Sequence, residues 1–335
     1  MRTLSRPELN RALLARQGLL ERRALSIPDA LDAMGGLQAQ YAPSMYIGLW
    51  SRLAGFERDA LTRALEERVV VQATLLRATI HLVSRADFWP LAVAIRDARR
   101  AWWRRVTKAE DLSPQAETLR AALRQGPMKR KAIEELVGKE AFRGIGMWVD
   151  MVRVPPSGTW ERRRADLFGL AEDWIGPPDV AFDDALDHLV TRYLTGFGPA
   201  SKAEIANWAG LANRDVEPAL ERLELRRFAA EDGAELFDLP GAPLPDGDTP
   251  APVRFLGTWD AVLLAHARRA LILPEEHRPK IFNTRMPQSI GTFLVDGSVA
   301  GTWKPDGTIE AFEALTEPQR RAVDDEFGRL RAFCA

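Results

Sequence analysis

The side chains that most often carry chemistry are few in this chain of 335 residues. Its four histidines, His81, His188, His266 and His277, show no HExxH, CxxC or other metal-ligand spacing. The single cysteine, Cys334, lies one residue from the C-terminus, where we expect neither an internal disulfide nor a catalytic role. The sequence also lacks a GxxxxGK[ST] loop and a strand-bound GxGxxG. We therefore expect neither a metal ion nor a cofactor.

Two glutamines, Gln38 and Gln40, follow the glycines Gly35 and Gly36. Residues at i and i+2 project to the same side only when the backbone is extended, and the glycines favour a non-helical backbone there. A glutamine amide offers one acceptor and two donors and stays neutral, so it can orient a water molecule but cannot remove its proton. A bare Gln-x-Gln pattern is not specific, however. On these residues alone, satisfying backbone groups at a helix end is the simpler role.

Two helix start signals precede these glutamines in the sequence. Ser5-Arg-Pro-Glu and Ser26-Ile-Pro-Asp each supply an N-cap, a proline in the first turn and an acidic residue near the positive helix end. Three helices followed by a hairpin are typical of a winged helix, which we place at residues 4–95. The patterns predict helices at about 5–20, 26–37 and 57–68 and strands at 69–71 and 75–83.

An internal repeat predicts two further units. Gly126-Pro127, Ile133 and Gly138 recur at a constant offset of 72 residues as Gly198-Pro199, Ile205 and Gly210. In each copy a helix precedes Gly-Pro, a second helix follows it, and the later glycine can end that helix with a positive φ. Strand-like segments behind each copy can form a wing, so we place winged helices at 112–175 and 182–240.

A proline-rich segment after Leu239 predicts a linker, and a β-rich C-terminal part follows at 252–335. We predict strands at 253–256, 293–295, 299–303 and 308–312 and a final helix at 317–333. The expected fold class is therefore α+β and mainly helical, with three tandem winged-helix motifs and a β-rich C-terminal part.

The net charge of −1 hides a basic middle segment. Arg96 to Arg164 holds 17 Lys and Arg against 9 Asp and Glu, whereas the rest of the chain holds 29 against 38. Residues suited to phosphate contact open the second helix of the middle unit and occupy its wing: Lys129, Arg130, Lys131, Arg162, Arg163 and Arg164. Exposed charge that only favours solubility is the alternative.

The chain begins without an apolar stretch of signal-peptide length and has no run of about 18 apolar residues. We expect a cytoplasmic, nucleoid-associated monomer that does not enter membranes.

The segment from Gly36 to Arg52 resembles the signature of the AlkZ family, whose members carry Gln, a hydrophobic residue and then Gln or Asp. The resemblance continues through residues 75–83, 194–199, 208–211 and 293–303 and so covers nearly the whole chain. It implies tandem winged helices curved around a basic DNA-binding concavity. It also implies a DNA glycosylase that excises alkylated purines from double-stranded DNA.

By this resemblance Gln38 and Gln40 are the catalytic residues, which place and polarise the attacking water while Ala39 turns toward the protein. Alkylation at purine N7 makes the base cationic, so the C1′–N9 bond breaks readily and positioning suffices. Gln in place of Asp at the second position resembles members that act on bulky adducts and interstrand crosslinks. We expect a monofunctional glycosylase of DNA repair or genotoxin self-resistance.

The same resembling segments contain three further candidate DNA contacts, Arg52, Arg77 and His81. His81 lies between Ile80 and Leu82 and could instead be a hydrogen-bonded interior residue.

Two other functions remain open. A non-catalytic winged-helix regulator would bind DNA without releasing a base, and a toxin-sequestering protein would use an aromatic pocket. A dimeric regulator usually needs an apolar dimerisation helix and a base-reading helix rich in Arg, Asn and Gln, and neither is evident.

Overall fold

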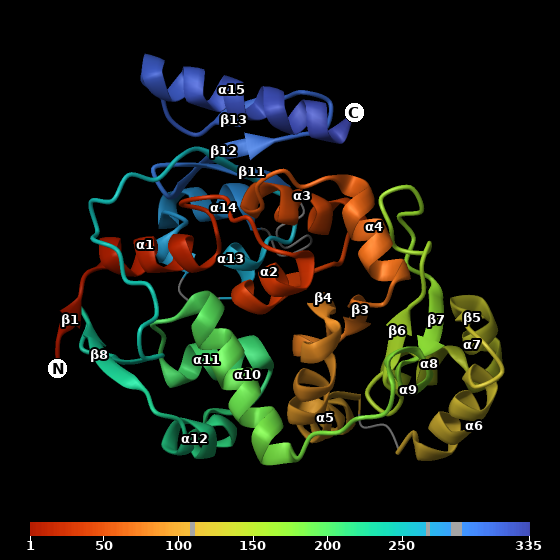
Figure 1. Cartoon of the computed structure of the whole chain (residues 1–335). Coiled ribbons are helices and arrows are strands. Elements are labelled where there is room, and N and C mark those ends of the chain that lie inside the picture. The colour runs from red at the N-terminus through yellow and green to blue at the C-terminus, as the bar shows by residue number, and fades with distance from the viewer. Residues whose placement is uncertain (108–110, 266–268, 283–289) are drawn as a thin grey trace.

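The computed structural model describes residues 1–107, 111–265, 269–282 and 290–335 (Figure 1). It has the α+β, mainly helical architecture that the sequence predicts. Among the described residues, strands form sheets of three, four and six members.

The N-terminal part follows the predicted start signals. Ser5 caps α1 in a capping box with Glu8, and the Ser26 side chain accepts from the backbone N–H of Asp29 at the start of α2. The segment after Gln40 forms a helix, α3, that the patterns above do not predict. The elements are α1 (Arg6–Arg16), α2 (Ile27–Met34), β2 (Leu37–Gln38), α3 (Ala42–Arg52), α4 (Arg58–Glu66), β3 (Val70–Thr74), the 3-10 turn η1 (Leu76–Ala78), β4 (Ile80–Ser84) and α5 (Arg85–Thr107).

The middle part joins the N-terminal hairpin in one sheet. β3 pairs antiparallel with β6, with Gln72 opposite Arg153, and the strand order is β2-β4-β3-β6-β7-β5. Its helices surround a separate core that includes Ile133 and Trp148. The elements are α6 (Ser113–Leu123), β5 (Met128–Lys129), α7 (Arg130–Val137), α8 (Lys139–Ile145), β6 (Met151–Arg153), β7 (Leu167–Leu170) and α9 (Ala171–Ile175).

In both copies of the repeat the later glycine ends a helix with a positive φ and the isoleucine is buried. Gly138 (φ +88°) ends α7 and Gly210 (φ +78°) ends α11, while Ile133 and Ile205 are both fully buried. A turn at Gly233 joins β8 to β9, and β1 (Thr3–Leu4) adds to β8 in parallel. The elements of the second copy are α10 (Phe182–Phe197), α11 (Lys202–Ala209), α12 (Asn213–Arg222), β8 (Arg226–Ala230) and β9 (Glu235–Asp238).

The C-terminal part is an antiparallel sheet in the order β10-β11-β12-β13 under the final helix, which lies at the top of Figure 1. Its elements are β10 (Arg254–Leu256), α13 (Ala261–Leu264), η2 (Arg269–Leu271), η3 (Glu275–His277), α14 (Arg278–Ile281), β11 (Gly291–Val295), β12 (Ser298–Trp303), β13 (Ile309–Ala311) and α15 (Glu317–Cys334). None of the described helices is long and apolar enough to cross a membrane.

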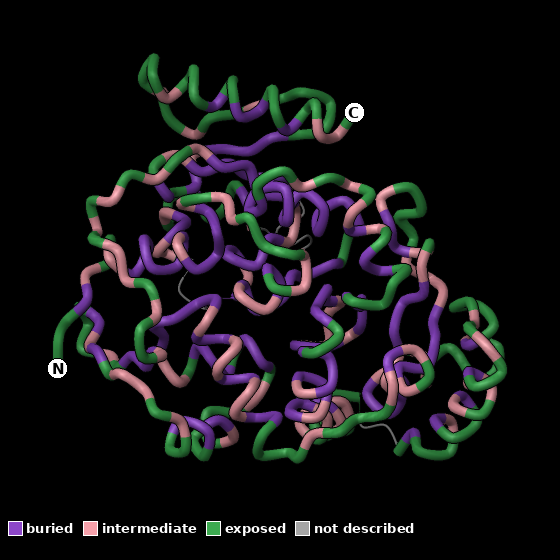
Figure 2. The backbone as a smooth tube through the Cα atoms, in the orientation of Figure 1, coloured by how far each residue is buried: buried purple, intermediate pink, exposed green. Residues whose placement is uncertain are grey.

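The largest core lies between the N-terminal part and the second repeat. Helix α10 contacts α1, α2, α5 and α12, and its Leu189, Tyr193 and Leu194 are fully buried. In Figure 2 the buried backbone runs through the middle of the molecule, whereas α15 exposes its outer face. Burial of side chains from distant segments in one core stabilises the arrangement of all of them.

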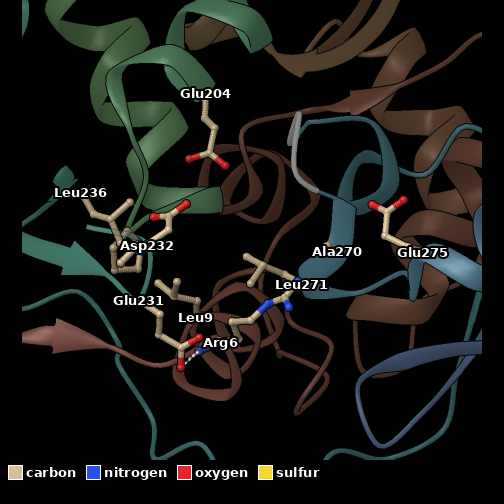
Figure 3. A pocket seen from close by; sticks show the side chains of 11 residues that line it. Arg6, Leu9, Glu204, Glu231, Asp232, Leu236, Ala270, Leu271 and Glu275 are labelled. Atoms are coloured by element: carbon tan, nitrogen blue, oxygen red, sulfur yellow. Dashed lines mark hydrogen bonds between the residues drawn. The ribbon is translucent and has the colours of Figure 1, made fainter. Parts of the chain in front are cut away.

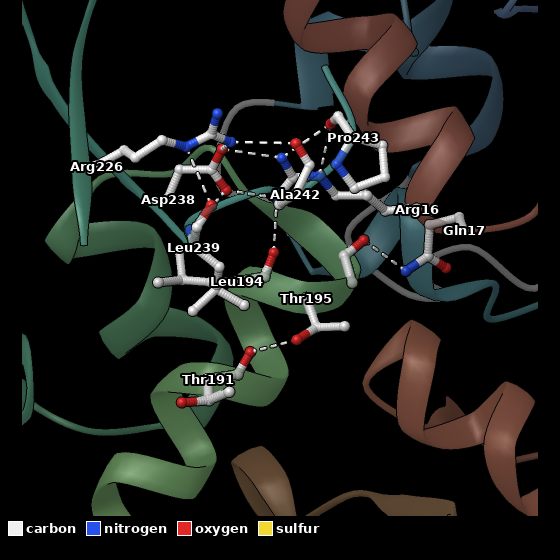
Figure 4. Close-up of polar contacts among 11 residues, drawn as sticks. Arg16, Gln17, Thr191, Leu194, Thr195, Arg226, Asp238, Leu239, Ala242 and Pro243 are labelled. Atoms are coloured by element: carbon white, nitrogen blue, oxygen red, sulfur yellow. Dashed lines mark hydrogen bonds and ion pairs between the residues drawn. The ribbon is translucent and has the colours of Figure 1, made fainter. Parts of the chain in front are cut away.

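A buried ion pair fastens α1 to three later segments (Figure 4). The Arg16 and Asp238 side chains are 1% and 0% exposed, and Nη1 donates to Asp238 Oδ1 over 2.7 Å. The same guanidinium donates to the carbonyl oxygens of Leu194 (2.8 Å) and Pro243 (3.0 Å). Arg226 donates to the other carboxylate oxygen of Asp238 over 2.6 Å. The proline-rich segment after β9 is therefore held against α1.

We expect Arg16→Met to lower the free energy of unfolding by about 3–5 kcal/mol, because it leaves the buried Asp238 carboxylate short of a partner. The matched control is Lys131→Met, whose ammonium lies 3.9 Å from Glu135 with both side chains exposed; it should cost less than about 1 kcal/mol. Urea unfolding of both variants measures the difference. Equal effects of the two substitutions would contradict the structural role of the Arg16–Asp238 pair.

Candidate active site

Two glycines bring the glutamine segment against the sheet. Gly35 (φ +74°) ends α2 and Gly36 (φ +77°) follows it, both in the left-handed region that favours glycine. A Cβ on Gly36 would lie 3.0 Å from a Val83 methyl carbon and 3.1 Å from the Leu82 carbonyl oxygen. The close approach lets β2 pair with β4, with Gln38 directly opposite His81.

The backbone beyond β2 stays on β4 for one more residue. The Ala39 N–H donates to the Ile80 carbonyl over 2.7 Å, and the Ala39 side chain is buried, as expected from the resemblance. Gln40 is exposed, and its Oε1 accepts from the Ile80 N–H over 2.8 Å. The side-chain oxygen of Gln40 is therefore bonded to the Ile80 backbone. The side-chain NH₂ group points away from this bond and can donate to another partner.

The Gln38 side chain is 7% exposed and lines a small cavity together with Arg77, His81 and Trp208. The cavity has a volume of about 10 Å³, which is room for the centre of about one water molecule. Gln40 does not line this cavity. Both glutamines thus meet β4, but the structure places Gln38 inside the cavity and Gln40 at the surface.

His81 is an interior residue, so the structure contradicts the phosphate contact predicted for it. Its side chain is 3% exposed, and Nδ1 lies 3.0 Å from the Thr79 carbonyl oxygen. Burial, with a smaller contribution from the positive charge of Arg77, lowers the pKa of His81 from 6.5 to about 3. His81 is therefore neutral at physiological pH and cannot bind a phosphate as a cation.

Arg77 reaches the cavity from a strained turn between β3 and β4. Arg77 (φ +50°) and Ala78 (φ +55°) are consecutive non-glycine residues in the left-handed region, which costs about 1–3 kcal/mol each. Arg77 Nη1 donates to the Trp208 carbonyl over 2.6 Å and so ties this turn to α11. Such strain persists where the surroundings hold a side chain in place, here at the edge of the cavity.

Arg52 is also an interior residue, so the structure contradicts the DNA contact predicted for it. Its side chain is 1% exposed, and Nη2 and Nη1 donate to the two carboxylate oxygens of Asp260 over 2.8 and 3.0 Å. Asp260 Oδ1 also caps α13 by accepting from the Val262 N–H. Helix α13 lines the cavity through Ala261 and Leu264, so Arg52 supports the site from behind.

The predicted basic residues of the middle part lie on the surface. Lys129, Arg130 and Lys131 are exposed at the start of α7, where Arg130 pairs with Glu134 and Lys131 with Glu135. Arg162, Arg163 and Arg164 are exposed in the wing.

Part of the positive charge counted in the sequence is not available to a ligand. Arg99 and Arg153 are buried, and burial lowers the pKa of each to about 10. Arg99 Nη1 donates to the Thr74 carbonyl over 2.7 Å, which uses the guanidinium to hold the end of β3.

The wing of the middle part reaches the glutamine segment, which the sequence did not predict. Arg163 Nη1 donates to the Tyr41 hydroxyl over 3.0 Å, and Tyr41 follows Gln40 and is 41% exposed. Trp160 packs edge-on against Tyr46 of α3, and Gln72 Nε2 donates to the Gly158 carbonyl. An exposed cation and an exposed ring therefore lie beside Gln40. The only sequence signal for Tyr41 is its position next to Gln40.

A larger pocket of about 550 Å³ lies elsewhere, between α1, η2 and the β8–β9 turn (Figure 3). Glu204, Glu231 and Glu275 line it, and Arg6 donates a backbone N–H to Glu231. Carboxylates repel phosphate groups, so this pocket does not suit the DNA backbone.

Among the described residues, one group of side chains has the spacing of metal ligands. Glu276, His277 and Glu313 offer ligand atoms within 4.8 Å of one another, but both carboxylates are exposed, and we assign no ion to them. His266 lies outside the described residues.

The neutral, buried state of His81 predicts a pH-dependent stability. Between pH 3 and 6.5 the unfolded chain binds a proton that the folded chain does not, so this contribution is complete above about pH 6.5 and falls as pH drops. Lowering the pH from 7 to 5.5 should therefore reduce the free energy of unfolding by about 1 kcal/mol, because the unfolded chain binds the proton at His81. Urea unfolding of wild type and His81→Gln at both pH values measures it, and identical pH dependence in the two proteins would contradict it.

Comparison with known proteins identifies the family. A family model described as DNA glycosylase AlkZ-like matches residues 31–333. Among solved structures, the Streptomyces sahachiroi DNA glycosylase AlkZ superposes with a TM-score of 0.82 at 18% sequence identity, over 99% of this chain and 97% of that chain, which shows a shared fold. A search of curated proteins gave no match. Since the family model spans most of the sequence, the chain belongs to the AlkZ-like family of DNA glycosylases.

Proposed function

We propose that this glycosylase is monofunctional and hydrolyses the N-glycosidic bond of N7-alkylated purines. Bulky adducts or interstrand crosslinks are the preferred lesions, in DNA repair or in genotoxin self-resistance. It acts as a monomer on double-stranded DNA, and its three helix-and-hairpin units at 4–95, 112–175 and 182–240 serve as winged helices.

The observation that carries this proposal is the absence of a carboxylate among the described residues that line the Gln38 cavity. An unmodified purine leaves slowly unless an acid protonates it, whereas a base alkylated at N7 already carries a positive charge. The cavity offers the Gln38 amide, the neutral His81 imidazole and the Arg77 guanidinium, and none of these is suited to protonate a base. It therefore suits a leaving group that needs no acid. Gln38 holds the water, and the NH₂ of Gln40 is the donor at the surface.

The preference for bulky lesions rests on Gln40, because the Gln-Gln form resembles the members that act on such adducts. Exposure of Gln40 and Tyr41 supports it, since an exposed site can reach a base without drawing it into a deep pocket. We further propose that DNA phosphates contact Arg77 and the exposed cations of the middle part. These cations are Lys129, Arg130, Lys131, Arg162, Arg163 and Arg164.

Single-turnover incubation with a duplex that carries one N7-methylguanine tests the chemistry. Wild type should release the base and leave strands that break only after alkali, and a bulky N7 adduct should be released faster. Gln38→Ala should slow release by about 10²–10³-fold, because it removes the group that positions the water, and Gln40→Ala should also slow it.

The matched control is Gln125→Ala at an exposed glutamine of the middle part, which should keep full activity. DNA binding without base release from either substrate would sink the enzymatic proposal and favour a regulator. Strand breakage before alkali would show that the enzyme is not monofunctional.

The position of Arg163 beside Tyr41 gives a separate prediction about binding. If one phosphate contact is lost, Arg163→Ala should reduce the slope of log affinity against log salt by about 1 on any duplex. Arg143→Ala on α8, which pairs with the exposed Glu140, is the control and should leave the slope unchanged. DNA-binding titrations at several salt concentrations measure the slopes. Equal slopes for wild type and both variants would show that Arg163 does not contact a phosphate.

A further inference from the structure

If the site hydrolyses the glycosidic bond as proposed above, the two glutamines do not account for one proton of the attacking water. The inference below rests on that proposed function. The water oxygen bonds to C1′, and the C1′–N9 bond breaks with its electron pair neutralising the cationic base. The oxygen now attached to C1′ must then lose a proton. An amide can orient the water, but it is too weak a base to take that proton.

His81 occupies the position from which it can reach the same water. It lies directly opposite Gln38 in the β2–β4 pairing, and the Ala39–Ile80 hydrogen bond makes Gln38 and His81 a non-hydrogen-bonded pair. Side chains in such a pair share one face of the sheet and lie closer together than in a hydrogen-bonded pair. Both side chains line the cavity that has room for about one water molecule.

The ring of His81 is held in one tautomer. A carbonyl oxygen can only accept, so the 3.0 Å contact between Nδ1 and the Thr79 carbonyl places the hydrogen on Nδ1. Nε2 of the neutral ring therefore carries a lone pair. Within the described part of the chain, no hydrogen bond to Nε2 is found, which leaves this atom to accept from a water.

We propose that His81 is a third catalytic residue, whose Nε2 accepts a hydrogen bond from the water that Gln38 positions and takes its proton as the bond to C1′ forms. The proton then passes to solvent, so the ring is regenerated. A neutral imidazole suits this step, because the oxygen bound to C1′ becomes strongly acidic only as the C–O bond forms. Burial and the nearby Arg77 keep the ring free of a proton beforehand, with a pKa of about 3.

The kinetic test compares two substitutions in the single-turnover assay. His81→Leu removes the acceptor and should slow base release by about 100-fold without changing DNA affinity. His81→Gln can orient the water through its side-chain oxygen but is too weak a base to take the proton, so it should slow base release by a similar factor. His277→Leu replaces another buried histidine outside the cavity and should have no effect on the rate. A purely structural role would leave His81→Gln active, because its NH₂ group can still donate to the Thr79 carbonyl.

Nitrogen-15 NMR of the unmodified protein supplies a second readout that does not depend on activity. The ring of His81 should appear at pH 7 as the neutral Nδ1–H tautomer, and an Nε2–H tautomer or an imidazolium would overturn the proposal. An active wild type with an unaffected His81→Leu variant would also overturn it, while leaving the proposed function intact. A wild-type protein that released no base from either substrate would overturn the proposed function itself.

Discussion

The pairing of β2 with β4 is the constraint on which the site depends. Only Leu37 and Gln38 form the strand, yet this register decides that Gln38 faces His81 and that Ala39 points inward. A shift by one residue would turn Gln38 away from the cavity, because neighbouring residues of a strand alternate between faces. The positive φ of Gly36 permits the approach, and the Gln40 side chain closes the segment by accepting from Ile80.

The buried Arg52 and the half-buried Arg77 hold distant parts of the chain around this short strand. Arg52 ties α3 to Asp260 and so fixes α13 at the back of the cavity, while Arg77 ties the β3–β4 turn to Trp208. The cavity is therefore built from segments of the N-terminal part, the second repeat and the C-terminal part. Because a buried guanidinium is costly without partners, each tie favours one arrangement of these segments.

Features with local causes could be predicted from the sequence, and features with tertiary causes could not. The capping serines Ser5 and Ser26 and the glycines Gly138 and Gly210 lie where expected, because caps and positive φ depend on adjacent residues. Helix α3 was missed because it is buried on all sides and so has no amphipathic period. The interior positions of Arg52 and His81, and the contact between Tyr41 and Arg163, depend on partners far along the chain.

The absence of a carboxylate from the described lining of the cavity follows from the same packing. A carboxylate in place of Gln38 would be almost fully buried beside Arg77 and would compete with the Trp208 carbonyl for that guanidinium. The turn that carries Arg77 and Ala78 in strained conformations would then lose the bond that holds it. An amide avoids both costs because it needs hydrogen bonds but no counter-ion. The architecture therefore favours a site without a strong acid or base, and such a site is sufficient only for a base that is already prepared to leave.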